Sequence, residues 1–577
     1  MHTFEVWAPR AGNVRVKLAD RLHSLERDED DWWRLKIEQA RPGDDYAFVL
    51  NESSTALPDP RSAFQPFGVH GPSRIVDHNA FRWTDQGWQA PPLSSAAVYE
   101  LHIGTFTSEG TFESAIERLA HLVDLGVTHV EIMPVSEFPG DRGWGYDGVD
   151  LYAPHHAYGG PEGLKRLVDA CHANGLAVLL DVVYNHLGPV GNYLGRFGPY
   201  FTDTYETPWG SAVNLDGPGS REVRRFFCDN ARMWLRDYHF DGLRIDAIHA
   251  FFDRSAIHFL EQLAMEIDGL ESHLGRQLVL IAESDLNQPA VVRPREAFGF
   301  GIDAQWSDDF HHALHTVLTG ERTGYYADFG SLANLAKAMK SVFVYDGVYS
   351  EFRKRIHGRP VVNLSATRFL GYLQNHDQIG NRARGDRSSH LMSIGRLKIA
   401  AALVLLSPFV PMLFQGEEFA VSAPFQYFTG YEDPQMGHAV SEGRKNEFAA
   451  FGWNPEDVPD PQAPETFQRS KLNWQEAGEP PHDALLDWHK RLIALRRSNS
   501  DLTSGSLEDT GVDFDEKRGF LALRRGAFIV ISNFAKTRLV APIEERDEIV
   551  LASDQGITRE SASVFIPPES VIILQRR

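Results

Sequence analysis

Four short segments of the sequence combine carboxylates with arginine, histidine or asparagine. They are DVVYNH (181–186), DGLRIDAIH (241–249), IAES (281–284) and LQNHDQIGN (373–381). Each includes or follows an apolar run of the kind that forms a buried strand. Paired carboxyl groups beside fixed cations suit acid–base and nucleophilic chemistry on a sugar bond. A single acidic residue after a strand is more often a helix cap, but four such clusters together favour one shared site.

Two of the carboxylates are predicted to divide the work of glycoside hydrolysis. Arg244 and Asp246 stand two residues apart on one strand, so their side chains point the same way and the guanidinium should keep Asp246 ionised. An ionised carboxylate suits a nucleophile. Glu283 ends the apolar run LVLIA, where desolvation should raise its pKa toward the value that a general acid needs. Asp377 is the third carboxylate, expected to hold substrate hydroxyls more tightly as the sugar ring flattens.

The elements that must position these groups are short apolar runs separated by helical patterns. They are AVYELHI (97–103), HVEIMP (129–134), AVLLDVV (177–183), GLRID (242–246), LVLIAE (278–283), FGIDAQW (300–306), FLGYLQNH (369–376) and PMLFQGEE (411–418). Near-continuous apolar strands alternating with helices indicate an α/β fold with a parallel sheet, and eight such units predict a (β/α)8 TIM barrel. A doubly wound sheet is the alternative. The barrel is preferred because polar residues cluster after several strands, where barrel active sites lie.

Alternating apolar residues on both flanks of the barrel predict two β-sandwich domains. The first occupies residues 1–88, and the second occupies residues 499–577, where FLALRRGAFIVISNF and SVFIPPESVIIL alternate. The catalytic barrel is then expected over residues 89–498. Its segment 187–220 is too long for a plain connection and is expected to form an elaborated loop over the barrel mouth.

The overall composition narrows the partners and the compartment. The chain has 577 residues with 57 Lys plus Arg and 79 Asp plus Glu, a formal charge of −22, which disfavours nucleic acid and anionic membrane surfaces as partners. The most apolar stretch, residues 399–414, contains a serine and two prolines and predicts a buried helix followed by a strand, so no membrane span is expected. Cys171 and Cys228 are the two cysteines, and the N-terminus lacks a signal-peptide pattern, so we expect a cytoplasmic protein.

The four polar segments resemble the conserved regions of the α-amylase family, glycoside hydrolase family 13. The resemblance implies that Asp246 is the nucleophile, Glu283 the acid/base and Asp377 the transition-state stabiliser of a retaining mechanism. It also implies a subsite for the sugar at the cleaved bond that includes Tyr146, His186, Arg244 and His376. Asn375, which flanks Asp377, is a further candidate for substrate binding. No cofactor is implied. No metal is predicted, because Asn185, at the position of a calcium ligand in several members, is one oxygen where calcium needs about six to eight.

Longer strings resemble one branch of that family, the maltooligosyltrehalose trehalohydrolases. They include RGWGYDGVDLYAPHHAYGGPEGL (142–164), DAQWSDDFHHALH (303–315) and FGWNPEDVPDPQAPETFQRSKLNW (451–474). The branch implies hydrolysis of the α-1,4 bond between a maltooligosaccharide and a terminal trehalose unit, which releases trehalose. Its substrate is maltooligosyltrehalose, and its pathway partner is maltooligosyltrehalose synthase.

Specificity for trehalose is expected on the leaving-group side of the cleaved bond. The candidates for holding trehalose are His249, Asp308, Asp309 and His311. A pocket that hydrogen-bonds the correct sugar discriminates strongly, because a wrong sugar leaves buried groups unpaired. Asp308, Asp309 and His311 fit equally well at the start of a helix, with one aspartate as its cap. Trp209 is either a sugar platform or a packed aromatic, and Trp306 is expected in the core.

Two other functions remain open from the sequence. A glycogen branching enzyme would share similar strands but would transfer the chain to a glucan 6-hydroxyl. A noncatalytic glucan-binding protein would keep the scaffold without its chemistry. The presence of all three carboxylates argues against the second alternative, and His249 together with the WSDDFHH string argues against the first.

Overall fold

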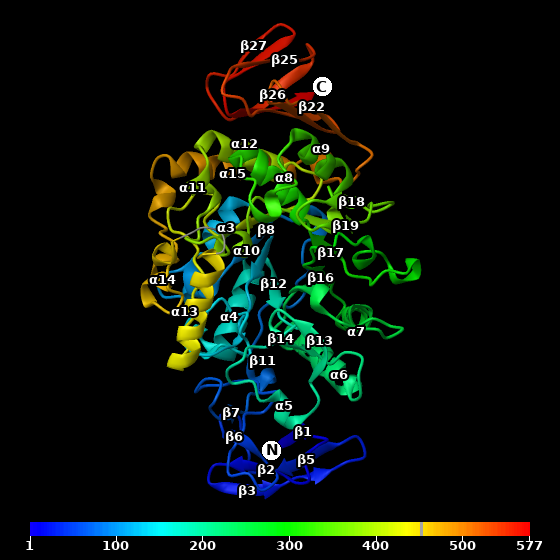
Figure 1. Ribbon diagram of the computed structural model, residues 1–577, viewed down its shortest axis with the longest axis vertical. Helices are drawn as coiled ribbons and strands as arrows, with labels where there is room; N and C mark the ends of the chain where they lie inside the picture. Colours follow the sequence, from blue (N-terminus) through cyan, green and yellow to red (C-terminus); the bar gives the residue numbers. More distant parts are fainter. Residues whose placement is uncertain (450–453) are drawn as a thin grey trace.

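The computed structural model describes residues 1–449 and 454–577, and its centre is a closed barrel of parallel strands (Figure 1). The strands are β8 (Val98–Leu101), β9 (His129–Ile132), β12 (Ala177–Val182), β15 (Gly242–Ile245), β16 (Val279–Ala282), β17 (Ala304–Trp306), β20 (Phe369–Gly371) and β21 (Val410–Phe414). Each of the predicted apolar runs overlaps one of them. The (β/α)8 barrel is therefore confirmed, and the doubly wound alternative is wrong.

The interior of the barrel changes from apolar to polar along the strands. An apolar cluster fills its lower part, with members that include Val98, Leu179, Val279, Ile281, Leu370 and Met412. Toward the C-terminal ends, the register pairs Asp181 on β12 with Arg244 on β15. It also pairs Glu100 on β8 with Glu131 on β9. Because side chains alternate along a strand, these polar groups share the inside of the barrel with the apolar layer beneath them.

Amphipathic helices surround the strands (Figure 1). The longer ones are α4 (Gly160–Ala173), α6 (Ser220–Asp237), α7 (Phe259–Leu274), α8 (Asp308–Thr319), α12 (Ile394–Leu405), α13 (Pro434–Ala449) and α15 (His482–Arg497). On α4 the predicted apolar face is buried, and Gly175 just beyond the helix adopts a left-handed φ of 75°. Cys171 on α4 and Cys228 on α6 are buried free thiols, as their helical pattern predicted.

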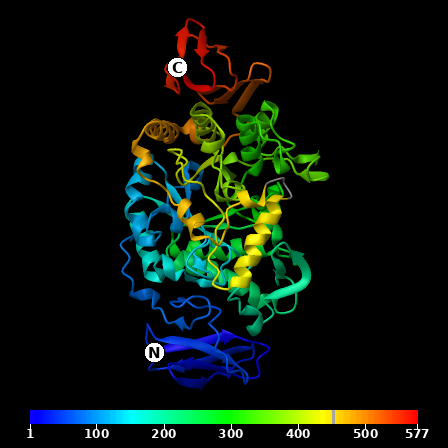
Figure 2. The same cartoon turned by 60° about the vertical axis from the view of Figure 1, so that its left-hand side comes forward.

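Separate β-sheets lie at the two ends of the molecule (Figures 1 and 2). The N-terminal sheets join β1 (His2–Trp7), β5 (Trp32–Ile37) and β4 (Glu26–Arg27), and β3 (Arg21–Ser24), β2 (Val14–Leu18), β6 (Asp45–Leu50) and β7 (Ser73–Arg74). The C-terminal sheets join β22 (Thr510–Asp515), β23 (Phe520–Arg525), β24 (Phe528–Asn533), β29 (Ser570–Arg576) and β26 (Asp547–Ala552), and β25 (Leu539–Pro542), β28 (Ser563–Ile566) and β27 (Thr558–Glu560). The predicted boundaries after residues 88 and 498 stay predictions.

The long segment 187–220 forms a hairpin of its own. Its strands β13 (Phe201–Thr207) and β14 (Gly210–Val213) pair antiparallel, and Trp209 lies in the turn between them.

In the described part of the chain, no helix is both long enough and apolar enough to cross a membrane.

A buried histidine joins the segment before the barrel to the lower end of the barrel. His172 on α4 lies between two carboxylates, with Nδ1 2.9 Å from Asp85 and Nε2 3.0 Å from Asp241. The indole of Trp88 stacks on the His172 ring and donates to Asp241. Burial lowers the pKa of His172, but the two carboxylates more than offset it, so the pKa is raised overall. A protonated His172 therefore places one positive charge between two buried anions, of which Asp85 also contacts Nδ1 of His239 at 2.7 Å.

We expect His172→Gln to lower the free energy of unfolding by about 3 kcal/mol at pH 6, because two buried carboxylates lose their shared cation. The raised pKa means that the stabilisation is complete below about pH 6.5, the value for an unfolded histidine, and is lost as pH rises through the folded value. Denaturant unfolding at pH 6 and pH 9 measures this. The difference between wild type and variant should shrink at pH 9, and an unchanged difference would contradict a charged His172.

Candidate active site

A cavity of about 430 Å³ lies at the C-terminal end of the barrel and contains the three predicted carboxylates. Its lining comes from segments far apart in the sequence. The lining residues are Trp144, Tyr146, Asp147, His186, Trp209, Asp246, Ala247, His249, Glu283, His376, Asp377, Asn381 and Tyr427. The structure therefore brings together Asp246, Glu283 and Asp377, as barrel topology requires of residues that follow different strands.

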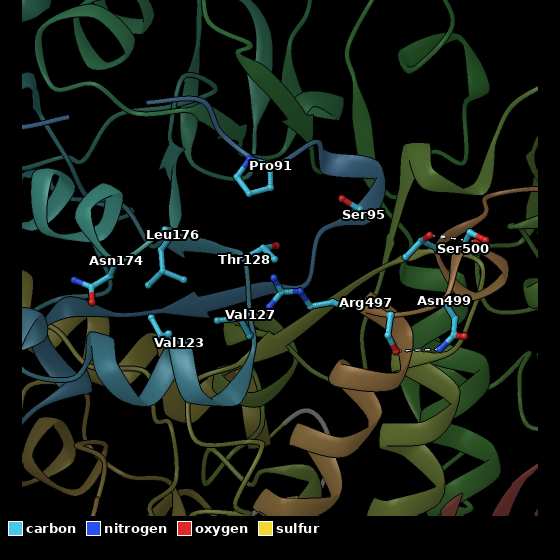
Figure 3. A pocket seen from close by; sticks show the side chains of 13 residues that line it. Pro91, Ser95, Val123, Val127, Thr128, Asn174, Leu176, Arg497, Asn499 and Ser500 are labelled. Carbon is cyan, nitrogen blue, oxygen red and sulfur yellow. Dashed lines mark hydrogen bonds between the residues drawn. The ribbon is translucent and has the colours of Figure 1, made fainter. Parts of the chain in front are cut away.

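A larger cavity, of about 640 Å³, lies near the N-terminal ends of the strands (Figure 3). Thr128 precedes β9, Leu176 precedes β12, and Arg497 enters from the end of α15. No Asp or Glu is among the residues that line it. Glycoside hydrolysis needs a pair of carboxyl groups, so the smaller cavity, which contains them, is the candidate active site.

Arg244 is the centre of the active-site network. Its Nη1 donates to Asp181 at 2.7 Å and to Asp246 at 2.9 Å, and its Nη2 lies 3.0 Å from Oε2 of Glu283. The guanidinium is fully buried, so bulk water does not reach these contacts. Arg244 thus bridges both carboxylates of the predicted catalytic pair, whereas the sequence suggested a contact with Asp246 alone.

Burial raises the pKa of Asp246 and of Glu283, and in both cases the charge of Arg244 opposes the rise. The two carboxyl groups also act on each other. A hydrogen bond from Glu283 lowers the pKa of Asp246, while the negative charge of Asp246 raises the pKa of Glu283. The pair therefore favours an ionised Asp246 beside a protonated Glu283, which is the division of charge between a nucleophile and a general acid.

The backbone after Asp246 holds Glu283 in place. Ala247 adopts a left-handed conformation, with φ 39° and ψ 53°, which is strained for a residue that has a Cβ. In this conformation its N–H donates to Oε2 of Glu283 at 2.8 Å, and the next N–H, of Ile248, donates to the Glu283 carbonyl at 3.0 Å. No sequence signal pointed to Ala247, because alanine gives no indication of a left-handed turn.

Tyr146 and His376 form one wall of the cavity. The Tyr146 hydroxyl donates to Asp181 at 2.6 Å and lies 2.7 Å from Nε2 of His376, and the two rings stack with centroids 5.1 Å apart. His376 also pairs with Glu100 through Nδ1 and through its backbone N–H. Burial lowers the pKa of His376, but Glu100 more than offsets this and the pKa is raised. A cationic His376 therefore lies beside Asp377.

Asp377 is positioned by two asparagines. Asn375 caps α10 (His376–Gly380), where its Oδ1 accepts from the N–H of Asp377 at 3.0 Å and of Gln378 at 3.3 Å. Asn375 is buried and does not line the cavity. Asn381, one helical turn beyond Asp377, donates to its Oδ1 at 2.7 Å. The i, i+4 spacing in QNHDQIGN was a usable signal for Asn381 that the sequence reasoning missed.

An aromatic platform lies at the rim of the cavity. The rings of His186 and Trp209 stack with centroids 4.8 Å apart and planes at 12°. Trp209 is 47% exposed, so it is not a core residue, and its aromatic surface at the cavity rim suits contact with a sugar ring. Asp147, in the predicted GYDGVD motif, also lines the cavity but was not among the predicted residues. Trp144 and Tyr427 line it too, and no local pattern indicated them.

The WSDDFHH string does begin a helix, α8, but Ser307 rather than either aspartate occupies the N-cap position. Asp309 accepts from the backbone N–H groups of Val344 and Tyr345 at 2.6 and 2.8 Å. His311 bonds to the Leu373 carbonyl at 2.6 Å and to the Tyr326 hydroxyl at 2.9 Å. Both residues are buried and neither lines the cavity, so the structure does not bring Asp309 or His311 to the predicted sugar site.

The structure separates the other two candidates, because His249 lines the cavity and Asp308 does not. His249 is exposed. Asp308 accepts from the Tyr372 hydroxyl at 2.5 Å. Burial raises the pKa of Asp308 to about 7, and the negative charges of Glu283, Asp285 and Asp377 add to the rise.

One group of three potential metal ligands occurs among the described residues, formed by Glu137, His155 and His156. The Glu137 oxygens are taken by His156, through Nδ1 at 2.7 Å and through the backbone N–H at 2.8 Å. His155 accepts from the Ala157 N–H through Nδ1 at 3.0 Å. Glu137 and Nδ1 of both histidines are thus engaged with the chain itself, whereas Nε2 of His155 is buried without a hydrogen-bond partner among the described residues.

Comparison with known proteins agrees with the fold. The family model for the alpha amylase catalytic domain matches residues 72–198. The malto-oligosyltrehalose trehalohydrolase of Rhizobium sp. (strain M-11) is 47% identical, over 99% of this chain and 97% of its own length. The protein of that name from Mycobacterium tuberculosis is 48% identical, over 98% and 97%. A crystal structure of a Salmonella typhimurium protein named as an alpha amylase has a TM-score of 0.91 and 38% identity, covering 100% of this chain and 97% of that one.

The closed barrel, the carboxylates above it and the matched catalytic domain define a protein of the α-amylase class. Within that class, the identity over nearly the full length of both chains decides the branch. The chain belongs to the malto-oligosyltrehalose trehalohydrolase family.

Proposed function

We propose that this chain hydrolyses the α-1,4-glucosidic bond next to the terminal trehalose unit of maltooligosyltrehalose, with retention of configuration. The observation that carries the chemistry is the contact of one guanidinium, that of Arg244, with both Asp246 and Glu283 in the cavity. The names of the relatives, which match this chain over nearly its full length, support the substrate.

In the first step, Glu283 donates its proton to the glycosidic oxygen while Asp246 attacks the anomeric carbon. The bond to the leaving sugar breaks, trehalose departs with the proton, and a β-linked glycosyl-enzyme forms on Asp246. In the second step, the Glu283 carboxylate takes a proton from water as the water attacks the same carbon. The bond to Asp246 breaks, and the maltooligosaccharide leaves as the α-anomer. Asp377 holds ring hydroxyls of the sugar through both steps.

The substrate-binding roles follow the position of each side chain. Tyr146, His186 and His376 line the cavity and surround the sugar at the cleaved bond. Arg244 is fully buried and acts through the carboxylates that it contacts. His249 and Asp308, on the side of Glu283, are our candidates for trehalose. Asn375 acts through Asp377. For Asp309 and His311 we propose an indirect role, because their hydrogen bonds tie α8 to neighbouring loops.

Incubation with maltotriosyltrehalose is expected to release free trehalose and maltotriose, and NMR at early times should show the α-anomer of maltotriose. Maltopentaose is the matched control, because it has as many glucose units but no trehalose end. It should be cleaved far more slowly, since the buried groups that bind trehalose would be left unpaired. Absence of free trehalose would overturn the proposal. New α-1,6 linkages formed in amylose would instead establish the branching enzyme.

We also propose that the reaction belongs to trehalose biosynthesis in the cytoplasm. The substrate must come from an enzyme that converts the reducing end of a maltooligosaccharide into a trehalose unit, which is the reaction class of maltooligosyltrehalose synthase. The two cysteines are buried free thiols, which supports a reducing compartment.

A further inference from the structure

Trp306 covers one face of the guanidinium that joins the catalytic carboxylates. It ends β17 and is 1% exposed. The central carbon of the Arg244 guanidinium lies 4.0 Å from the centroid of the indole ring. Tryptophan has the aromatic face that attracts a cation most strongly, and the attraction is larger when water is excluded, as it is here.

The position of the Arg244 plane decides which carboxylates it reaches. Nη1 donates to Asp181 and Asp246, whereas Nη2 forms an ion pair with Glu283 at 3.0 Å without hydrogen-bond geometry. A guanidinium presents its donors in a rigid planar fork, so a rotation of that plane would break contacts with the nucleophile and the acid together. Hydrogen bonds hold only the Nη1 edge of the guanidinium, so the indole against its face is a major restraint on the tilt of the plane.

A purely space-filling role explains Trp306 less well. The indole packs against Tyr372 and lies within the apolar cluster of the barrel interior. However, its Nε1 is buried and has no hydrogen-bond partner among the described residues, which costs stability that phenylalanine or leucine would not lose. What the indole adds over those side chains is the extended aromatic face against Arg244.

We propose that Trp306 is a positioning residue for the reaction, which acts by holding the Arg244 guanidinium in the plane that contacts Asp246 and Glu283. The proposal rests on the proposed function, because its main assay measures trehalose release. It assigns to a buried core tryptophan an effect on the ionisation of the catalytic pair.

The test compares Trp306→Leu and Trp306→Phe with Trp234→Leu. Trp234 is an equally buried tryptophan on α6 that bonds to Asn230 and has no contact with Arg244. Trehalose release gives kcat/KM as a function of pH for each variant. We expect Trp306→Leu to lower kcat/KM by about 30-fold, and Trp306→Phe, which keeps a smaller ring, by about 3- to 10-fold.

The pH profile separates positioning from packing. Because Arg244 holds down the pKa of both Asp246 and Glu283, a loosened Arg244 should move both limbs of the profile upward, by about half a pH unit in Trp306→Leu. Trp234→Leu should lose stability, but neither limb of its pH profile should shift. The proposal would be overturned if both limbs of the Trp306→Leu profile lay within about 0.2 pH units of wild type and its kcat/KM lay within about 3-fold of wild type.

A stability measurement keeps the two proposals distinguishable. If the wild type released no trehalose, the proposed function would fail. The contact of Trp306 with Arg244 would then be tested only by the free energy of unfolding of the variants. With Arg244 loosened, carboxylate pKa values in the folded state rise, so the Trp306 variants should lose more stability at pH 7 than at pH 4.5. Equal losses at both pH values, as expected for Trp234→Leu, would overturn the role of Trp306.

Discussion

Replacing Asp246 by alanine should lower kcat by about 10⁴-fold or more, a loss of ~5 kcal/mol in transition-state stabilisation. The carboxylate that would form the glycosyl-enzyme is then missing, and Arg244 keeps Asp181 and Glu283 as its carboxylate partners. Trehalose release from maltotriosyltrehalose measures the loss. Asp268→Ala on α7, whose side chain is 60% exposed and pairs only with Arg295 among the described ion pairs, is the matched control and should keep wild-type turnover.

Azide distinguishes a missing nucleophile from a misfolded site. In Asp246→Ala, azide can attack the anomeric carbon from the face that the carboxylate occupied, while Glu283 still protonates the leaving trehalose. The expected product is the β-configured glycosyl azide of maltotriose. Near-normal turnover of the variant, or a rescued product with α configuration, would show that Asp246 is not the nucleophile.

Glu283→Gln is expected to lower kcat on maltotriosyltrehalose by about 10³-fold, because both proton transfers lose their donor and acceptor. A maltotriosyl donor with a dinitrophenolate leaving group needs no proton in the first step. On that donor the first step should stay fast and the glycosyl-enzyme should accumulate. Azide should then release the α-configured glycosyl azide, opposite to the product of Asp246→Ala. Glu266→Gln, a partly exposed change on α7, is the control.

The same variant should change the pH dependence of kcat/KM. In the wild type, activity needs an ionised Asp246 and a protonated Glu283, so the profile should be bell-shaped. Burial and the charge of Asp246 raise the pKa of Glu283, so activity is lost on the alkaline side as pH rises through that raised value. Glu283→Gln should lack this alkaline limb. An alkaline limb that persists in Glu283→Gln would assign it to another group, of which Asp308 is the nearest candidate.

The fold was predictable because its signals are local. Each strand of the barrel is a short apolar run, and the helix at 161–174 has its apolar residues on one face. The grouping of Asp246, Glu283 and Asp377 also followed, since residues after the strands of one barrel must meet at one end. The helix start in WSDDFHH was equally local, although Ser307 rather than an aspartate occupies its N-cap position.

The contacts that tune the site were not predictable in this way. Tyr146 meets His376 across 230 residues of chain, and Glu100 meets His376 across 276. Their pairing depends on the stagger of the closed barrel, which no local pattern encodes. The same is true of the left-handed turn at Ala247, which depends on the contact of its N–H with Glu283.

By itself, the sequence determined the barrel, the terminal sheets and the residue types available for glycoside chemistry, because hydrophobic periodicity and strand ends are local properties. The tertiary structure decided how those residues act. Only there does one buried guanidinium contact Asp181, Asp246 and Glu283 at once, with Trp306 against its face. Charge sharing and desolvation depend on distances between groups far apart in the chain, and only the packed barrel sets those distances.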